Sequence, residues 1–263
     1  MKKGLIQVLL IGFLLSLLVA CGSESNNGTA ANNESDQNDE KEVLIMATSA
    51  DFPPFESYDT DGNFEGFDIE IAKVIAEELG YELEIEDMSF DGLIGALQSG
   101  RVDFVMAGMS ATEERRQNVD FSKEYHRSGE MFIYQPDESI NGLEELEGKT
   151  VGVQLGTIQE EGADVLSEEY GFEVKKVDDA SVLIQELMSN RIDVAYMDKT
   201  VATGYINSQG LEGFDDPTTS SPGMGIAFPK GSELVEQVNE ILTALEKDGT
   251  IDELEEEWLS EYE

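Results

Sequence analysis

The sequence predicts an α/β protein built from two similar lobes that are joined by a double hinge. Strand-like apolar runs alternate with amphipathic segments from residue 43 onwards, a pattern typical of parallel βαβ units. The segment LIGALQSGRVDFVM at residues 93–106 recurs as LIQELMSNRIDVAY at 183–196, and EELGYEL at 77–83 recurs as EEYGFEV at 168–174. Two matches in the same order, at offsets of 90 and 91 residues, indicate that one structural unit occurs twice.

The composition of the 263-residue chain excludes several classes of function. A formal net charge of −41 would repel the phosphates of a nucleic acid. The chain is 40% hydrophobic, and its apolar residues recur periodically, which argues against an acidic disordered polymer. Cys21 and His126 are the only residues of their kinds, so we expect no disulfide framework, no metal site and no cofactor.

The first 41 residues have the features of an exported lipoprotein. Two lysines precede an apolar run that ends in small residues, which predicts a signal peptide over residues 1–20. LVAC at 18–21 resembles the bacterial lipobox, so we expect Cys21 to carry the lipid. Residues 21–41 would then be a lipidated cysteine and a disordered tether. This predicts anchoring at the outer face of the cytoplasmic membrane, at the cell surface or in the periplasm. The alternative is an uncleaved anchor helix.

The first half of the folded part contains three predicted strands and two predicted helices. Residues 43–48 (VLIMAT) are continuously apolar, as expected of a strand buried on both faces. Asp68 caps a predicted helix that Gly80 ends, and Asp91 caps a second helix. The other two strands are expected at residues 83–85 and 102–107.

The segment DTDGN at residues 59–63 weakly resembles a calcium-binding loop. The glycine that such a loop needs at its sixth position is replaced by Phe64. We therefore predict a hairpin turn on Asp61 and Gly62.

Two extended segments are predicted to cross between the lobes, at residues 131–136 and 220–231. With these crossings, residues 42–130 and 225–263 form lobe 1, and residues 131–224 form lobe 2. A strand at 151–157 opens lobe 2 as the strand at 43–48 opens lobe 1. Two final helices, at 233–247 and 250–259, are expected to pack on lobe 1 with Trp258 as an anchor.

Ligands of parallel α/β sheets bind beyond the carboxyl ends of the strands, and these ends therefore define the candidate site. Arg115, with Ser110 and Thr157, could receive a carboxylate. Asp198 could receive an ammonium group, because the repeat places it opposite Gly108. Desolvating both ligand charges is favourable only when each meets a partner, so the pattern predicts a zwitterionic amino acid as ligand. The complete candidate ligand-binding set is Phe52, Phe90, Ala107, Gly108, Ser110, Arg115, Gln154, Thr157 and Asp198.

Several motifs resemble those of the family-3 solute-binding proteins of polar amino-acid ABC importers. They include DFPPFE at 51–56, GFDIEIAKVIAEELG at 66–80, FDGLIGALQSGRVDFV at 90–105 and VGVQLGT at 151–157. The resemblance implies a type II periplasmic-binding-protein fold, the bilobal Venus flytrap. It also implies delivery of the ligand to a membrane permease driven by a cytoplasmic ATPase, by a binding protein that we expect to be a monomer. Members of the family typically have proline where this chain has Glu113.

The same resemblance assigns roles within the site. The α-carboxylate would contact Arg115, Ser110 and the Thr157 region. The α-ammonium would contact Asp198 and the carbonyl of Ala107, while Phe52 and Phe90 would pack on the ligand side chain.

Five positions are expected to face the ligand side chain, and they decide which amino acid is bound. These positions are Ser49, Asp51, Glu56, Gln154 and Met197. Relatives that bind glutamine often have an acid, a lysine and a histidine at positions 49, 154 and 197, and all three are absent here. Asp51 and Glu56 favour a basic ligand such as arginine or lysine. Glutamine and cystine remain alternatives.

Two other functions are possible on the same fold. Secreted dehydratases of the arogenate and cyclohexadienyl type need a general acid in the cleft, for which only Asp51 or Glu56 would qualify. No nucleophile, metal cluster or phosphate loop is evident, so we expect no enzyme. A nutrient-sensing receptor module is the second alternative.

Overall fold

A computed structural model describes residues 41–219 and 222–262 of the chain. The predicted signal peptide, the predicted lipid on Cys21 and all but the last residue of the predicted tether lie outside the described residues.

The first sheet has five strands in the order β4-β1-β5-β12-β6. Strand β1 pairs in parallel with β4 and β5, and β12 is antiparallel to both β5 and β6. The strands are β1 (Val43–Thr48), β4 (Glu82–Asp87), β5 (Phe104–Val105), β6 (Asp120–His126) and β12 (Met224–Phe228). A separate hairpin of β2 (Ser57–Tyr58) and β3 (Phe64–Glu65) confirms the predicted turn, where Gly62 has a φ of 85°.

The second sheet repeats this arrangement with the order β11-β7-β10-β8-β9. Strand β8 pairs in parallel with β9 and β10, while β7 is antiparallel to β10 and β11. Both sheets therefore have three parallel strands followed by a reversed strand and one outer strand. The strands are β7 (Glu130–Tyr134), β8 (Thr150–Gln154), β9 (Glu173–Val177), β10 (Val194–Asp198) and β11 (Glu212–Asp215).

A matched pair of aspartates confirms the internal repeat at atomic level. Asp103 Oδ2 accepts the backbone N–H of Ile45 at 2.7 Å, and Asp193 Oδ2 accepts that of Thr150 at 2.7 Å. Each aspartate precedes a central strand and fixes its register against the strand beside it. These bonds make Thr150 equivalent to Ile45, and the strand predicted at 151–157 is observed as Thr150–Gln154.

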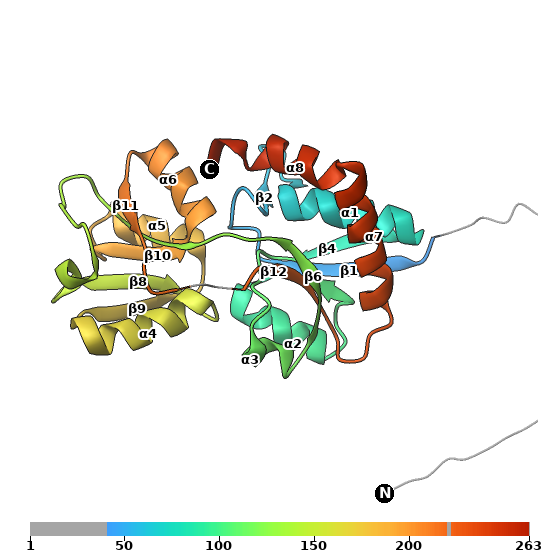
Figure 1. Cartoon of the computed structure of the whole chain (residues 1–263), viewed down its shortest axis with the longest axis horizontal. Helices are drawn as coiled ribbons and strands as arrows, with labels where there is room; N and C mark the ends of the chain where they lie inside the picture. Colours follow the sequence, from blue (N-terminus) through green and yellow to red (C-terminus); the bar gives the residue numbers. More distant parts are fainter. Residues whose placement is uncertain (1–40, 220–221, 263) are drawn as a thin grey trace, which may run out of the picture. The chain divides into compact units, whose positions relative to one another are not determined.

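The chain crosses between the sheets twice, from β6 to β7 and from β11 to β12 (Figure 1). The predicted crossings at residues 131–136 and 220–231 are both misplaced, because residues 224–228 of the second range form β12 of the first sheet. Residues 131–134 belong to β7, whose Phe132 and Ile133 are fully buried, so the apolar run serves as a sheet strand. The predicted lobe limits remain a prediction, which the membership of the strands supports.

The helices cover the faces of both sheets. They are α1 (Phe67–Leu79), α2 (Leu93–Gln98), α3 (Glu113–Arg116), α4 (Ile158–Tyr170), α5 (Ala180–Met188), α6 (Lys199–Gln209), α7 (Leu234–Asp248) and α8 (Thr250–Trp258). Three short 3-10 turns, η1 (Phe90–Gly92), η2 (Leu143–Leu146) and η3 (Ser260–Tyr262), complete the described elements.

The predicted helix caps Asp68 and Asp91 are both wrong. The N-cap of helix α1 lies two residues earlier, at Gly66, where a Cβ would lie 2.2 Å from the carbonyl oxygen of Phe55. This close approach places Asp68 inside the first turn, where its side chain is fully buried. Asp91 lies within η1, and the N-cap of that turn is Ser89.

Helices α7 and α8 pack on the first sheet and α1, as predicted, and Trp258 contacts the same core. The last turn, η3, then reaches α6 of the second sheet (Figure 1). Asn207 Nδ2 donates to the Glu261 carbonyl at 3.1 Å, and a Cβ on Gly204 would lie 2.5 Å from the Tyr262 ring.

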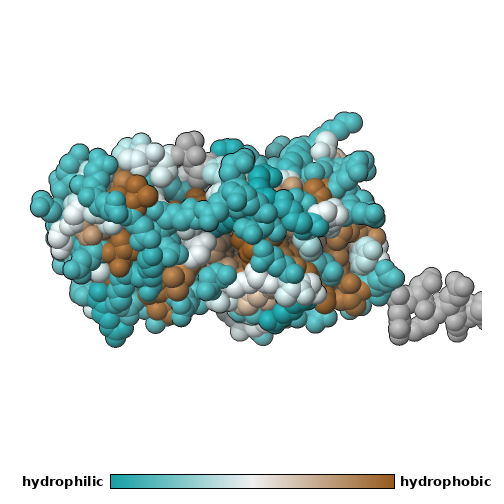
Figure 2. Space-filling view, turned by 90° about the horizontal axis from the view of Figure 1, so that it is seen from below, coloured by the Kyte–Doolittle hydropathy of each residue, from teal (hydrophilic) through white to brown (hydrophobic). Residues whose placement is uncertain are grey.

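The surface seen in Figure 2 is mainly hydrophilic, with hydrophobic residues in separate patches. Within residues 41–219 and 222–262, no helix combines the length and apolar character needed to cross a membrane.

Candidate functional site: a cavity at the strand ends

A partly enclosed cavity lies where strand ends of the two sheets meet. Its lining is Ser49, Asp51, Phe52, Glu56, Phe90, Ala107, Gly108, Ser110, Arg115, Gln154, Thr157, Ile158, Gln159 and Asp198. All the predicted site residues except Met197 are therefore brought together.

Arg115 is a buried cation shared between the two halves of the site. Its guanidinium donates to the Ser110 carbonyl at 2.8 Å and to the Gly156 carbonyl at 2.9 Å. The guanidinium carbon lies 5.3 Å from the centroid of the Phe90 ring, which supports it from one side. Burial lowers the pKa of Arg115 to about 10, so the group stays charged at neutral pH. Arg115 makes no ion pair with any residue in the described part of the chain.

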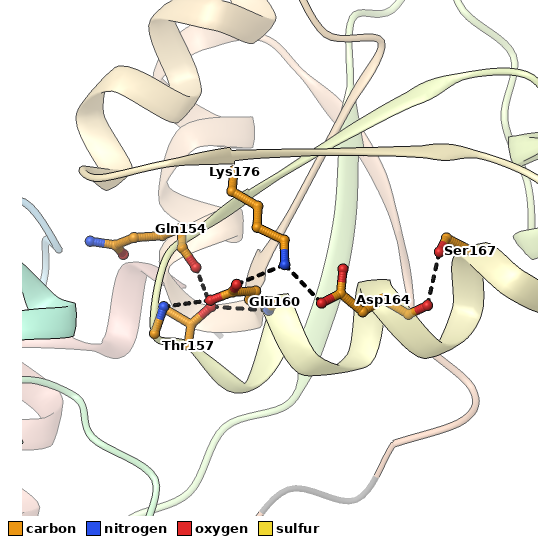
Figure 3. Close-up of polar contacts among 7 residues, drawn as sticks. Gln154, Thr157, Glu160, Asp164, Ser167 and Lys176 are labelled. Atoms are coloured by element: carbon orange, nitrogen blue, oxygen red, sulfur yellow. Dashed lines mark hydrogen bonds and ion pairs between the residues drawn. The ribbon is translucent and has the colours of Figure 1, made fainter.

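The second sheet presents the start of α4 to the cavity. Thr157 is the N-cap of this helix: its hydroxyl accepts the Glu160 N–H at 3.1 Å and donates to the Gln154 carbonyl at 2.7 Å. Figure 3 shows this arrangement, with Lys176 bridging Glu160 and Asp164 at 2.8 Å each. The network fixes the loop between β8 and α4, so the positive end of the α4 dipole would face an anion bound in the cavity.

Asp198 ends β10 and is the N-cap of α6. Its Oδ1 accepts the N–H groups of Thr200 at 2.8 Å and Val201 at 3.3 Å, and the Ser128 hydroxyl at 3.0 Å. These bonds use one carboxylate oxygen and leave Oδ2 free for a donor in the cavity. Burial raises the pKa of Asp198 to about 7.

Met197 does not face the cavity, which corrects its predicted role. Successive side chains of a strand point to opposite faces of the sheet, so Met197 and Asp198 cannot both reach the site. Met197 is 3% exposed and lies in the hydrophobic core.

The end of the cavity that carries Asp51 and Glu56 is acidic. Asp51 accepts the Ser49 hydroxyl at 3.0 Å, Gln154 Nε2 at 3.4 Å and the N–H of Ala180 at the start of α5. It therefore links the loop after β1 to two elements of the other sheet. Burial raises the pKa of Asp51 to about 6.

Glu56 is fully buried in the same end, and neither of its carboxyl oxygens accepts a hydrogen bond from a donor in the described part of the chain. Burial is the main cause that raises its pKa well above the usual range, and the negative charge of Asp68 adds to it. Within the described residues, no group of three or more acidic, cysteine or histidine side chains is arranged to hold a metal ion.

The cavity lining also includes Ile158 and Gln159, which follow Thr157 at the start of α4. The Gln159 amide donates to the buried Glu130 carboxylate, so its side chain is held in place. The TIQEE sequence after the strand signals a helix start, and the first-turn residues of such a helix would have been the correct additions.

Gly156 has a structural role that was also missed. Its φ is 76°, and a Cβ there would lie 2.9 Å from the Cα of Asp91. The loop after β8 therefore meets η1 of the other half of the site almost backbone to backbone.

Residues 44–261 match the sequence profile of the bacterial extracellular solute-binding proteins, family 3. The chain belongs to this family. This solute-binding protein is 43% identical, over 99% of both chains, to the arginine-binding extracellular protein ArtP of Bacillus subtilis (strain 168).

Solved structures agree with this assignment. An ancestral arginine-binding protein bound to arginine superposes with a TM-score of 0.79 at 41% identity, covering 84% of this chain and all of that one. The ancestral amino acid-binding protein AncCDT-1, a precursor of cyclohexadienyl dehydratase, superposes with a TM-score of 0.77 at 36% identity, covering 83% and 95%. The solute-binding protein thus has the bilobal, type II Venus-flytrap fold predicted from its sequence.

Proposed function

We propose that this protein binds a free amino acid outside the cytoplasmic membrane and delivers it to the permease of an ABC importer. The observation that carries this proposal is the pairing of two buried, opposite charges in one cavity, Arg115 and Asp198. Each can neutralise one end of a zwitterion, because Arg115 has no ion-pair partner in the described part of the chain and Asp198 has a free oxygen.

A basic amino acid, arginine above lysine, is the favoured ligand. Apart from Arg115, the titratable residues lining the cavity are the acids Asp51, Glu56 and Asp198. With Asp198 assigned to the α-ammonium, Asp51 and Glu56 remain for a cationic side chain. ArtP and the arginine-bound ancestral protein, to which this chain is similar, are named for arginine.

The membrane permease and a cytoplasmic ATPase are the proposed partners, and the lipid on Cys21 is the proposed anchor of a monomer. Tethering near the permease would raise the local concentration of loaded protein. The ligand would be held without a metal or cofactor.

A dehydratase is the second candidate, because Glu56 is a buried carboxyl in the cavity and AncCDT-1 is named as a dehydratase precursor. Binding is favoured because Arg115, Thr157 and Asp198 all serve the invariant ends of an amino acid. Incubation with arogenate, followed by product analysis, tests this alternative, and turnover would support it.

The decisive experiment is thermal unfolding of residues 42–263 against all common amino acids, cystine and ornithine. A ligand that binds only the folded form raises the midpoint by mass action. We expect the largest rise with arginine, followed by lysine or ornithine. A flat response across the panel would refute amino-acid binding, and a rise with cystine or glutamine alone would refute the basic ligand.

A further inference from the structure

A further carboxyl, that of Asp68, lies next to Glu56 but does not line the cavity. Asp68 and Glu56 are both 0% exposed, and Asp68 Oδ1 and both Glu56 oxygens have no hydrogen-bond partner in the described structure. Asp68 Oδ2, in contrast, accepts the Gly108 N–H at 2.8 Å and the Tyr125 hydroxyl at 2.8 Å. Two donors thus stabilise Asp68 as the anion, while Glu56 has none.

Two neighbouring carboxylates cannot both be ionised in a buried site unless a cation joins them. The groups around this pair supply none. Tyr125 of β6 is a neutral donor, and Asp51 and Asp198 are further acids that act on Glu56 from the loop after β1 and from β10. The nearby ring of His126 packs on Phe55 and Phe67 and is paired with Glu255 of α8. One proton therefore has to remain on the pair, and the donors to Asp68 leave it on Glu56.

We propose that the Glu56–Asp68 pair holds one proton in the ligand-free protein and releases it only when a ligand with a cationic side chain binds. We call this pair the selector of ligand charge. The inference rests on the proposed function. A cationic side chain that enters beside Glu56 replaces the proton: the Glu56 O–H bond breaks, the proton passes to solvent, and the carboxylate pairs with the ligand cation. A neutral side chain leaves the proton in place and can accept a hydrogen bond from the Glu56 O–H.

Asp68 acts in this scheme as a positioning residue, because it sets the affinity of Glu56 for its proton without touching the ligand. Burial raises the pKa of Asp68 to about 7 and that of Glu56 well above its usual range, which agrees with a proton held at neutral pH. Affinity for a cation should then rise with pH, whereas affinity for a neutral isostere should lack this component.

The test compares arginine with citrulline, its uncharged isostere, by titration calorimetry of the full mature chain in two buffers of different ionisation enthalpy between pH 5 and 8. The number of protons released per ligand is the readout. Protons lost from Asp198 when it meets the α-ammonium are common to both ligands and cancel in the difference. We expect arginine to release up to about one proton more than citrulline. Should citrulline fail to bind, the proton count and pH profile for arginine in the variants below still decide.

Glu56→Gln should abolish the extra proton and lower the affinity for arginine by about 30-fold or more, the scale of a broken buried charge pair. Asp51→Asn is the matched comparison: it should also weaken arginine binding, but the extra proton should persist in it above about pH 7, where Asp51, with a pKa of about 6, is already ionised. If the proton disappears in Asp51→Asn and persists in Glu56→Gln, the assignment to Glu56 is overturned.

Two further variants move the pH of half-maximal release in opposite directions. Asp68→Asn removes a negative neighbour and should shift it downward, and Tyr125→Phe removes a donor to the Asp68 anion and should shift it upward. Damage to the fold would not give opposite signs. Normal arginine binding without an extra proton at any pH from 5 to 8 overturns the selector and leaves the proposed function intact. Absence of arginine binding overturns the proposed function itself.

Discussion

The two lobes have the same arrangement of strands, but the residues that follow equivalent strands differ in charge and polarity. Each sheet has the same order of parallel and reversed strands, and Asp103 and Asp193 make the same bond at equivalent places. At the ends of the equivalent strands β5 and β10, however, the first lobe has Ala107 and Gly108, and the second has Asp198. The strands fix the fold, and the few residues beyond them carry the function.

The loops after β1 and β8 differ in the same way. The loop after β1 is long and carries Asp51, Phe52 and Glu56, whereas the loop after β8 leads directly into α4 at Thr157. The first lobe therefore supplies the aromatic walls, the acids and the Arg115 cation. The second supplies a helix N-terminus and Asp198, so neither lobe alone has both receptors for a zwitterion.

The largest expected effect on binding comes from replacing Arg115, whose guanidinium donates to one carbonyl in each lobe. Arg115→Ala should weaken arginine binding by about 2–5 kcal/mol, because the ligand carboxylate loses its buried cation. Titration calorimetry measures this loss. Arg116→Ala is the matched control, since Arg116 donates to the Ala111 carbonyl and packs on Phe121 outside the cavity. Equal binding by Arg115→Ala and the parent protein would disprove the site.

The next effect concerns Asp198, which has no acidic counterpart at the end of β5. Its folded pKa of about 7 exceeds the ordinary value of 3.8, so the folded ligand-free protein holds the proton more tightly than the unfolded chain. Stability from this group is complete below about pH 4 and is lost as the pH rises to 7, by up to about 1.4 kcal/mol per pH unit. Urea unfolding at several pH values should show a shallower decline for Asp198→Asn, and an unchanged slope would contradict the assignment.

The shared framework itself can be tested through its two equivalent aspartates. Asp103→Ala should destabilise the protein by about 1–3 kcal/mol, because the Ile45 N–H loses its acceptor in a half-buried place. Asp193 is exposed, so water can replace it, and Asp193→Ala should cost about 0.5–1.5 kcal/mol. Urea unfolding measures the free energy lost in each variant. A larger loss for Asp193→Ala than for Asp103→Ala would contradict the argument that burial decides the cost.

The smallest effects compare the threonine caps, one from each lobe. Thr157→Val should cost about 1–2 kcal/mol, because Glu160 loses its acceptor and the Gln154 carbonyl its donor. Thr112 caps only the four-residue α3, so Thr112→Val should cost about 0.5–1 kcal/mol. Equal losses of unfolding free energy in the two variants, measured by urea unfolding, would mean that the hydrogen bond from the Thr157 hydroxyl to the Gln154 carbonyl does not contribute to stability.

Most of the site could be predicted because strand ends converge whatever the details of packing. Arg115, Thr157 and Asp198 follow apolar strands, and the repeat alone placed Asp198 opposite Gly108. The facing of a side chain depends on register, however, and for that reason Met197 was placed in the site although it belongs to the core.

The role of Asp68 was predicted incorrectly for a different reason. Its sequence context suits a helix cap, and only the close contact of Gly66 with the Phe55 carbonyl starts the helix early and turns the carboxyl inward. The first crossing was misplaced because MFIY is equally suited to a connector and to a buried strand. Both errors arise from tertiary contacts that no local pattern encodes.

The close approach of Gly156 to Asp91 limits how near the two lobes can come at this point. With no side chain between them, further approach at this point would press main chain against main chain. A ligand bound between the lobes would therefore have to fit the space that this contact leaves.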